Sequence, residues 1–458
     1  MTDATAAPDG PEPVTVNTEP APYSAPFAPG YTRYAMFLLL GIYIVNFLDR
    51  AIINILAEPI KHDLKLADWQ LGLMSGLAFA LFYTVLGIPI ARLAERKNRP
   101  LIIASSVLVW SGFTALSGAA NNFVQLVAAR IGVGVGEAGC TPPAHSLIAD
   151  YVPKEKRASA LAFYAMGTPI GGLVGLVMGG LVADAFGWRA AFLVAGVPGI
   201  LFAILAATTL KEPRKLLSKQ LEAARIAGSA TFSQTMKYLS GKRTFWLIAF
   251  AAAIKAFIGY GHAPFTASFF LRNHGAEIER LADMFGLGSL GFLGLALGIL
   301  GGVSGAISSF LGGWLADKFG AKDLRGYMIF PAVASLITVP VYIFAVTLPT
   351  ATGALIVLAF NGLLGSLWYG PVYATGQSVV PPHMRATAAA ILLFIINLIG
   401  LGLGPLAVGA LSDYFSVGMA MGSAEGVRWA LIVSTCAGFF AFFLFWFARK
   451  TIREDHVG

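Results

Sequence analysis

Residues 36–56 read MFLLLGIYIVNFLDRAIINIL, an apolar run in which Asp49 and Arg50 are the only charged residues. A helix of about twenty residues crosses the ~30 Å hydrocarbon core of a bilayer, and similar runs follow one another almost to the end of the chain. Because no water satisfies the backbone there, each run must be helical, whereas a β-barrel would show short alternating strands. This stretch therefore predicts an all-α polytopic membrane protein with two charges inside the membrane.

The composition supports this prediction, since 57% of the 458 residues are hydrophobic and 12% are charged, against roughly a quarter charged in soluble domains. We expect twelve helices, near 33–57, 69–91, 100–120, 122–149, 157–184, 188–209, 244–271, 286–315, 326–347, 351–379, 385–412 and 427–448. They divide into two six-helix bundles, residues 31–210 and 244–450, joined by a linker at 211–243 with a helical stretch at 216–226. Residues 1–30, with seven prolines and no basic residue, are expected to be a disordered tail, and residues 451–458 a second tail.

The net charge of +8 reflects topology. Of the 32 Lys and Arg residues, 23 fall on the side of the two termini, six on the opposite side and three (Arg50, Arg130 and Lys255) inside helices. The positive-inside rule then places both termini in the cytoplasm of a bacterial cell, with the protein in its inner membrane. The distribution gives no nucleic-acid-binding face.

Cofactor chemistry has no basis in the sequence. Residues 134–139 read GVGEAG, formally a dinucleotide fingerprint, but they lie within a helix and have no βαβ unit around them. The chain contains no Walker-type Gly-Lys-Ser/Thr loop, and its two cysteines, Cys140 and Cys436, are far apart in sequence. We therefore expect neither an enzyme, a metal site nor an ATP-driven pump.

Two loops at equivalent places in the two halves share a pattern. Residues 91–99 read ARLAERKNR after the second helix, and residues 313–322 read GWLADKFGAK after the eighth. Each has a small residue, an acid four positions later and a base directly after the acid. An acid of this kind can bridge the neighbouring bases or cap a helix N-terminus. The residues expected to form this gate are Glu95, Arg96, Arg99, Asp317, Lys318 and Lys322.

These loops resemble the two copies of the signature loop of the major facilitator superfamily. Asn98 replaces a glycine of that loop, but like glycine it tolerates a left-handed backbone. The run from Arg130 to Ala138, RIGVGVGEA, resembles the second motif of the family, R-x-x-x-G-x-G-E-A. The resemblance implies two bundles that rock about a central site, with the loop charges holding one state closed.

The resemblance extends to the spinster-like branch, whose members transport sphingolipids and lysolipids. It is carried by residues 47–50, 95–99, 136–157 and 385–413. Sugar-acid and organic-anion symporters share the pattern at residues 188–199. The branch implies an amphiphilic anionic substrate, such as a lysophospholipid or sphingoid phosphate, and the symporters imply a small organic anion.

The charges inside the amino-terminal helices predict proton coupling. Asp49 and Arg50 diverge by about 100° around their helix, while Arg130 and Glu137 lie two turns apart on one face. A buried carboxylate changes its protonation when an arginine moves towards it or away. We predict that Asp49 and Glu137 carry protons and that Arg130 is their switchable partner, with Arg50 beside them. A purely structural pairing of helices 1 and 4 is the alternative.

The expected substrate site joins both halves. Lys255 lies too deep in its helix for its ammonium to reach the interface, so with Arg50 it is expected to bind a phosphate or carboxylate. The other residues assigned to this site are Asn46, Tyr369, Tyr373 and Asn397. Pairing of Lys255 with a carboxylate, and aromatic residues acting as interface anchors, are the alternatives.

These expectations combine into a proton-coupled secondary transporter of an amphiphilic anion, working as a monomer among membrane lipids. A symporter of sugar acids or other small carboxylates is the alternative of the same class. A sensor or scaffold that does not transport is a third, disfavoured because charges inside a membrane are costly to retain.

Overall fold

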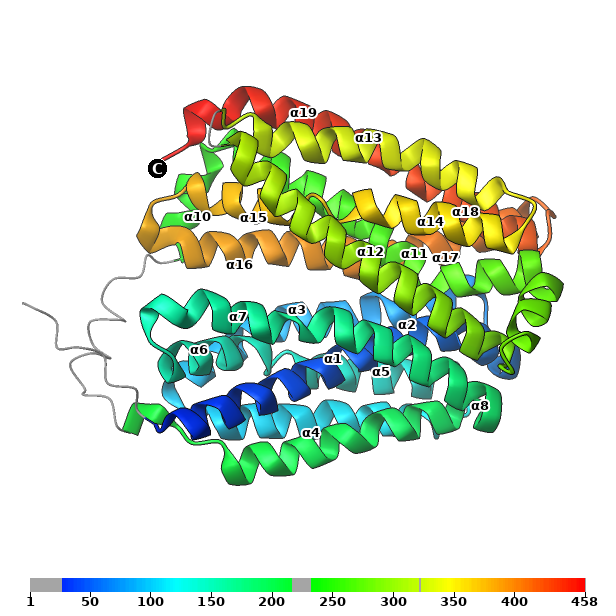
Figure 1. The fold of residues 1–458 in the computed structure, drawn as a ribbon, viewed down its shortest axis with the longest axis horizontal. Coiled ribbons are helices and arrows are strands. Elements are labelled where there is room, and N and C mark those ends of the chain that lie inside the picture. Colours follow the sequence, from blue (N-terminus) through cyan, green and yellow to red (C-terminus); the bar gives the residue numbers. More distant parts are fainter. Residues whose placement is uncertain (1–26, 216–231, 321–322, 458) are drawn as a thin grey trace, which may run out of the picture.

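The computed structural model describes residues 27–215, 232–320 and 323–457, and its elements are helices throughout those ranges (Figure 1). Eleven apolar segments there are long enough to cross a bilayer. One of them, Ser159–Thr209, bends at Gly187, where φ is 82°, and so makes two passes. The prediction of a twelve-helix, all-α membrane fold is confirmed.

In the amino-terminal bundle, drawn in blue to green in Figure 1, several of the apolar segments are divided into two helices in succession. Its elements are α1 (Pro29–Leu64), α2 (Asp68–Ser75), α3 (Leu77–Arg96), α4 (Arg99–Ser117), α5 (Phe123–Glu137), α6 (Thr141–Tyr151), α7 (Arg157–Ala165) and α8 (Gly167–Thr209).

The carboxy-terminal bundle, drawn in green to red, follows the short helix α10 (Phe232–Ser240). Its elements are α11 (Arg243–Asp283), α12 (Ser289–Gly320), α13 (Gly326–Thr347), α14 (Ala351–Gly365), α15 (Tyr369–Ser378), α16 (Arg385–Ile395), the π-helix η4 (Ile396–Leu403), α17 (Gly404–Asp413), the π-helical turn η5 (Tyr414–Gly418), α18 (Ser423–Thr435) and α19 (Ala437–Asp455).

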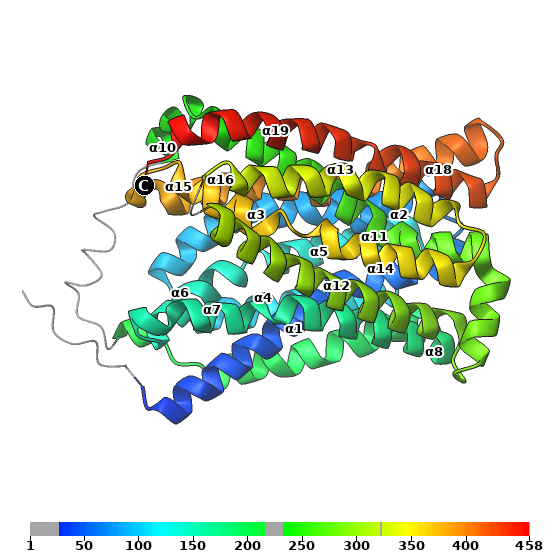
Figure 2. The ribbon, with the colours of Figure 1, turned by 45° about the horizontal axis from the view of Figure 1, so that its top comes forward.

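Both bundles run along the same axis, so the molecule has two ends. The end where α1 begins and α19 finishes is here called the termini end, and the end where α1 passes into α2 is called the closed end (Figures 1 and 2). Figure 2 shows α12 lying along α8, which places the fifth and eighth passes side by side.

The apolar cores explain how the bundles are joined. One core belongs almost wholly to the amino-terminal bundle and a second to the carboxy-terminal bundle. A third is shared, because Ile55 and Leu71 of one bundle pack with Phe269, Leu293 and Val408 of the other. The shared core lies at the closed end, so hydrophobic burial holds the bundles together there.

Several helices run further than the apolar runs predicted. Helix α1 begins at Pro29 and continues to Leu64, and α19 continues to Asp455, beyond the expected boundary at residue 450. Asp455 accepts a hydrogen bond from the backbone N–H of Thr244 at 2.8 Å and so caps the start of α11. The added turns at the ends of these helices contain polar residues. A boundary drawn from the apolar run alone therefore ends too early.

The linker and the first loop also differ from expectation. Helix α10 occupies part of the predicted linker, while the predicted helical stretch at 216–226 and most of the predicted tail at 1–30 lie outside the described residues. Asn98 has φ −67° and ψ 110°, so it is extended, not left-handed. Its side chain accepts a hydrogen bond from Leu101 N at 3.1 Å, which makes it the N-cap of α4.

Candidate functional site

A central cavity lies between the bundles and is lined by both. It consists of two adjoining pockets of about 440 Å³ each, which share Asn54 of α1 and Lys255 of α11. Arg50 and Arg130 line the pocket nearer the amino-terminal bundle. Among the described residues that line the two pockets there is no aspartate or glutamate. The walls therefore carry positive charge in an otherwise largely apolar space.

The Arg50 side chain carries the strongest contact beside this cavity. Its Nε lies 2.6 Å from Oε2 of Glu137, whose side chain is fully buried between α1 and α5. The guanidinium also lies over the rings of Phe79 and Tyr83, at 4.9 and 4.5 Å. This is a charge-assisted contact of the strong kind, further supported by cation–π attraction.

The other two charges of this cluster are less well paired. Asp49 accepts a hydrogen bond from Thr114 at 3.0 Å through Oδ2, and its Oδ1 has no hydrogen-bond partner in the described part of the chain. The Nε and Nη1 atoms of Arg130, a residue with 1% exposure, are likewise without one there. In this state Glu137 pairs with Arg50 and not with Arg130, because the turn of α1 directs Arg50 towards α5.

The residues assigned to substrate binding are only partly brought together. Lys255 and Tyr369 line the cavity. Asn46 is buried near the charge cluster, and Tyr373 stacks on Tyr369 with ring centroids 6.3 Å apart. Asn397 is half-buried in η4. These last three are not among the residues that line the two pockets, so their role in binding stays a prediction.

The side chains of the loop residues make no hydrogen bond or ion pair between the bundles in the described part of the structure. Glu95, Arg96, Asp317 and Lys318 are exposed, and Lys318 lies over the Trp314 ring at 4.5 Å. Lys322 lies outside the described residues.

Arg99, which was expected to belong to the gate together with Glu95, pairs with two other acids. It is fully buried and bonds Asp150 through Nη1 at 2.6 Å, and it also forms an ion pair with Glu212. Burial acts to raise the pKa of the Glu212 carboxyl, but hydrogen bonds from Arg99 outweigh it and hold that pKa below its usual value. Arg99 therefore fastens the start of the linker to the amino-terminal bundle.

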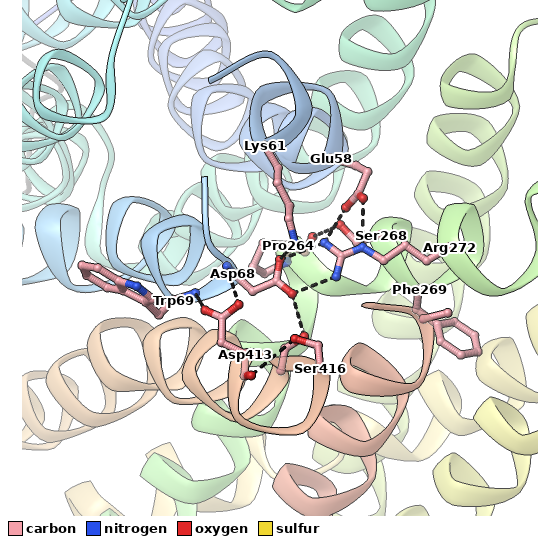
Figure 3. Close-up of polar contacts among 12 residues, drawn as sticks. Glu58, Lys61, Asp68, Trp69, Pro264, Ser268, Phe269, Arg272, Asp413 and Ser416 are labelled. Carbon is pink, nitrogen blue, oxygen red and sulfur yellow. Dashed lines mark hydrogen bonds and ion pairs between the residues drawn. The ribbon is translucent and has the colours of Figure 1, made fainter. Parts of the chain in front are cut away.

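Among the described residues, a cluster of ion pairs and hydrogen bonds joins the bundles at the closed end, and the sequence did not indicate it (Figure 3). Arg272 of α11 donates to both oxygens of Glu58 at 2.9 and 2.7 Å and to both oxygens of Asp68 at 2.8 Å. Asp68 also accepts from Lys61 and Ser412, each at 2.6 Å. The three charged side chains of this contact are at most 8% exposed, so it is a buried, forked ion pair across the interface.

Two aspartates add helix caps across the same interface. Asp413, which ends α17, accepts from the backbone N–H groups of Asp68 and Trp69 at 3.1 and 2.8 Å (Figure 3). Asp184 on α8 accepts from Leu290 and Gly291 at the start of α12, the Gly291 contact being 2.6 Å. Each bundle thus supplies the cap of a helix in the other bundle.

A two-bundle helical membrane protein with a charged cavity between its halves is the architecture of a secondary transporter. The family model of the Major Facilitator Superfamily matches residues 39–405, and the chain belongs to this superfamily.

Relatives refine that placement. An "MFS-type efflux pump" of Mycolicibacterium smegmatis is 30% identical over 92% of this chain and 94% of its own. A "Hexuronate transporter" of Bacillus subtilis is 26% identical over 82% of this chain and 87% of its own. The crystal structure of a bacterial homolog to the human lysosomal transporter Spinster, inward-facing and unoccupied, superposes with a TM-score of 0.82 at 31% identity, over 94% of this chain and 100% of that one. The resemblance to the spinster-like branch is confirmed.

Proposed function

We propose that this transporter carries an amphiphilic anion, such as a lysophospholipid or sphingoid phosphate, by alternating access coupled to protons. The observation that carries the proposal is the Arg50–Glu137 ion pair beside a cavity whose charged lining is entirely basic. A substrate anion and the Glu137 carboxylate compete for the same guanidinium. Protonation of Glu137 releases Arg50 to the substrate, and loss of the proton restores the pair.

The distribution of basic residues supports a cytoplasmic location for the termini end. On this assignment the closed end faces the periplasm, and the buried ion pairs there support a state open towards the cytoplasm. In the opposite state the loop charges Glu95 and Asp317 brace the cytoplasmic side. Replacing either by Ala is expected to favour the cytoplasm-open state by about 1–3 kcal/mol, measurable from label distances between the bundles.

A small organic anion is the second candidate substrate. It is favoured by the polar groups of the cavity in the carboxy-terminal bundle, including His262 and Asn361, and by the similarity to a hexuronate transporter. Both candidate substrates carry an acidic group, but only the amphiphilic anion has an apolar tail.

The test compares transport by purified protein in liposomes across pH, with lysophosphatidate and glucuronate as alternative cargo. Glu137→Gln and Asp49→Asn keep size and hydrogen-bonding capacity but remove the titrating proton. Both are expected to retain some binding and to lose the pH dependence of transport. Glu425→Gln, an exposed acid at the closed end, is the control. Wild-type pH dependence in both buried-acid variants would refute the assignment of Glu137 and Asp49 as proton carriers and leave them as structural partners of Arg50 and Arg130.

A further inference from the structure

The cations of the cavity differ in what neutralises them. Arg50 is matched by Glu137 at 2.6 Å, whereas Arg130, which lines the pocket nearer the amino-terminal bundle, has two donor atoms without a partner among the described residues. Lys255 is 8% exposed, and among the described residues no carboxylate lies within ion-pair distance of it. An isolated buried ammonium is costly unless something compensates its charge. Lys255 lines both pockets, and it is the one Lys, Arg, Asp or Glu among the described residues that line the pocket nearer the carboxy-terminal bundle. It is therefore the cation available to a ligand in that pocket.

Among the described residues, a single hydrogen bond is made by the Lys255 ammonium, so two of its three N–H groups have no partner there. Its Nζ donates to Thr338 Oγ1 at 3.3 Å, and Thr338 in turn donates to the Ser335 carbonyl at 3.1 Å. Thr338 is thus an acceptor towards the lysine, and a neutral one. The remaining ammonium protons are free for a ligand in the pocket that Lys255 lines.

The rest of that pocket supplies uncharged polar groups. Asn361 Oδ1 is buried there without a hydrogen-bond partner in the described part of the chain, and as an acceptor it can bind a hydroxyl group of the ligand but not its oxyanion. His262 Nε2 lies 2.9 Å from Ser434 Oγ. The Ser434 hydroxyl donates its hydrogen bond to the Ala430 carbonyl at 2.7 Å, so it can only accept from His262. His262 Nε2 therefore donates. Asn54 reaches the same pocket from the amino-terminal bundle.

We propose that the pocket around Lys255 is the primary subsite for the oxyanion of the substrate, a carboxylate or a phosphate. This rests on the proposed function, and it makes Lys255 of the carboxy-terminal bundle the permanent partner of the oxyanion. Arg50, which lines one of the two pockets together with Lys255, becomes a second partner when Glu137 is protonated. A ligand that touches Lys255 and Asn54 together links the two bundles, which is what a transported substrate must do in order to drive their rocking.

The test measures binding to the full-length protein by calorimetry, with n-dodecyl phosphate and glucuronate as the two probes. In Lys255→Met we expect the affinity for the bound probe to fall on the order of tenfold to a hundredfold. The melting temperature of the unliganded variant should stay the same or rise, because an apolar side chain replaces an uncompensated buried charge. Lys255→Arg keeps the charge and should retain part of the affinity. Lys237→Met, on α10 at the termini end, is the matched control.

The outcomes separate the two proposals. Wild-type affinity in Lys255→Met overturns the subsite but leaves anion transport standing. A wild-type protein that binds neither probe overturns anion transport of both kinds. Loss of affinity together with a lower melting temperature in both Lys255→Met and Lys255→Gln identifies a structural lysine and also overturns the subsite. The probe that binds identifies the source of the oxyanion, lipid-like or small.

Discussion

Replacing Arg272 by Ala should release the closed end. The guanidinium makes four hydrogen bonds to Glu58 and Asp68 across the interface, and its own side chain is 5% exposed. Removing one partner of a buried ion pair costs about 3–5 kcal/mol. We expect the lower end of that range, because Asp68 keeps its contacts with Lys61 and Ser412.

We expect this cost to fall on the closed state only, since opening of that end would expose the carboxylates to water. A change of about 3 kcal/mol lowers the ratio of closed to open molecules by about two orders of magnitude. Spin labels on Phe186→Cys and Val417→Cys, exposed positions of the two bundles at this end, report the change by double electron–electron resonance after Cys140 and Cys436 are replaced by Ala.

The matched control for this prediction is Arg428→Ala. Arg428 lies at the same end, but it pairs with Glu425 inside the carboxy-terminal bundle, so its loss should leave the label distances unchanged. Arg272→Lys keeps the charge without the forked geometry and should give an intermediate distribution. If the distances of Arg272→Ala and wild type coincide, Arg272 does not hold the bundles together.

Three further predictions concern the same interface and the linker. Asp413→Ala removes the cap on α2 and should favour the open state by about 0.5–2 kcal/mol, which the label distances report. Asp413→Asn keeps an acceptor and should have a smaller effect. Equal effects of the two variants would exclude the cap. Gly409→Ala places a methyl carbon 2.3 Å from the Asp68 carbonyl oxygen and should force the closed end apart, while Gly112→Ala, with nothing within 4 Å, should not. The pKa of the Glu212 carboxyl is lowered in the folded protein. Its contact with Arg99 therefore stabilises the folded protein at pH values above the ordinary glutamate pKa, near 4.5. This stabilisation is lost as the pH falls through the lowered pKa. Glu212→Gln should therefore reduce the melting temperature at pH 7 and much less in strongly acidic buffer, and an equal reduction at both pH values would contradict this assignment.

The fold was predictable because each pass carries its own apolar signal, and the buried charges of α1 and α5 were predictable because they interrupt that signal. Which arginine pairs with Glu137 was not, since the choice between Arg50 and Arg130 depends on how α1 is rotated against α5.

The closed end could not be predicted from a single sequence. Glu58, Asp68 and Arg272 lie near helix ends, where charged residues are common and carry no special meaning. The pairing of Arg272 joins positions more than 200 residues apart. Local periodicity in the sequence does not indicate a contact between such distant positions. The repeated loops, which the sequence did indicate, lie at the opposite end of the molecule.

The two exchanged caps have an evolutionary consequence. Asp184 ends the fifth pass and holds the eighth, while Asp413 ends the eleventh and holds the second, so each contact is the image of the other under the exchange of halves. In a two-fold dimer of half-length chains, one aspartate in the sequence would form both of these caps, because each residue of an isologous interface occurs once in each subunit. Because each aspartate binds backbone N–H groups, the receiving helix can change its side chains without losing the contact. After fusion of the halves, such a cap tolerates sequence drift on the receiving side and leaves only the two carboxylates under constraint.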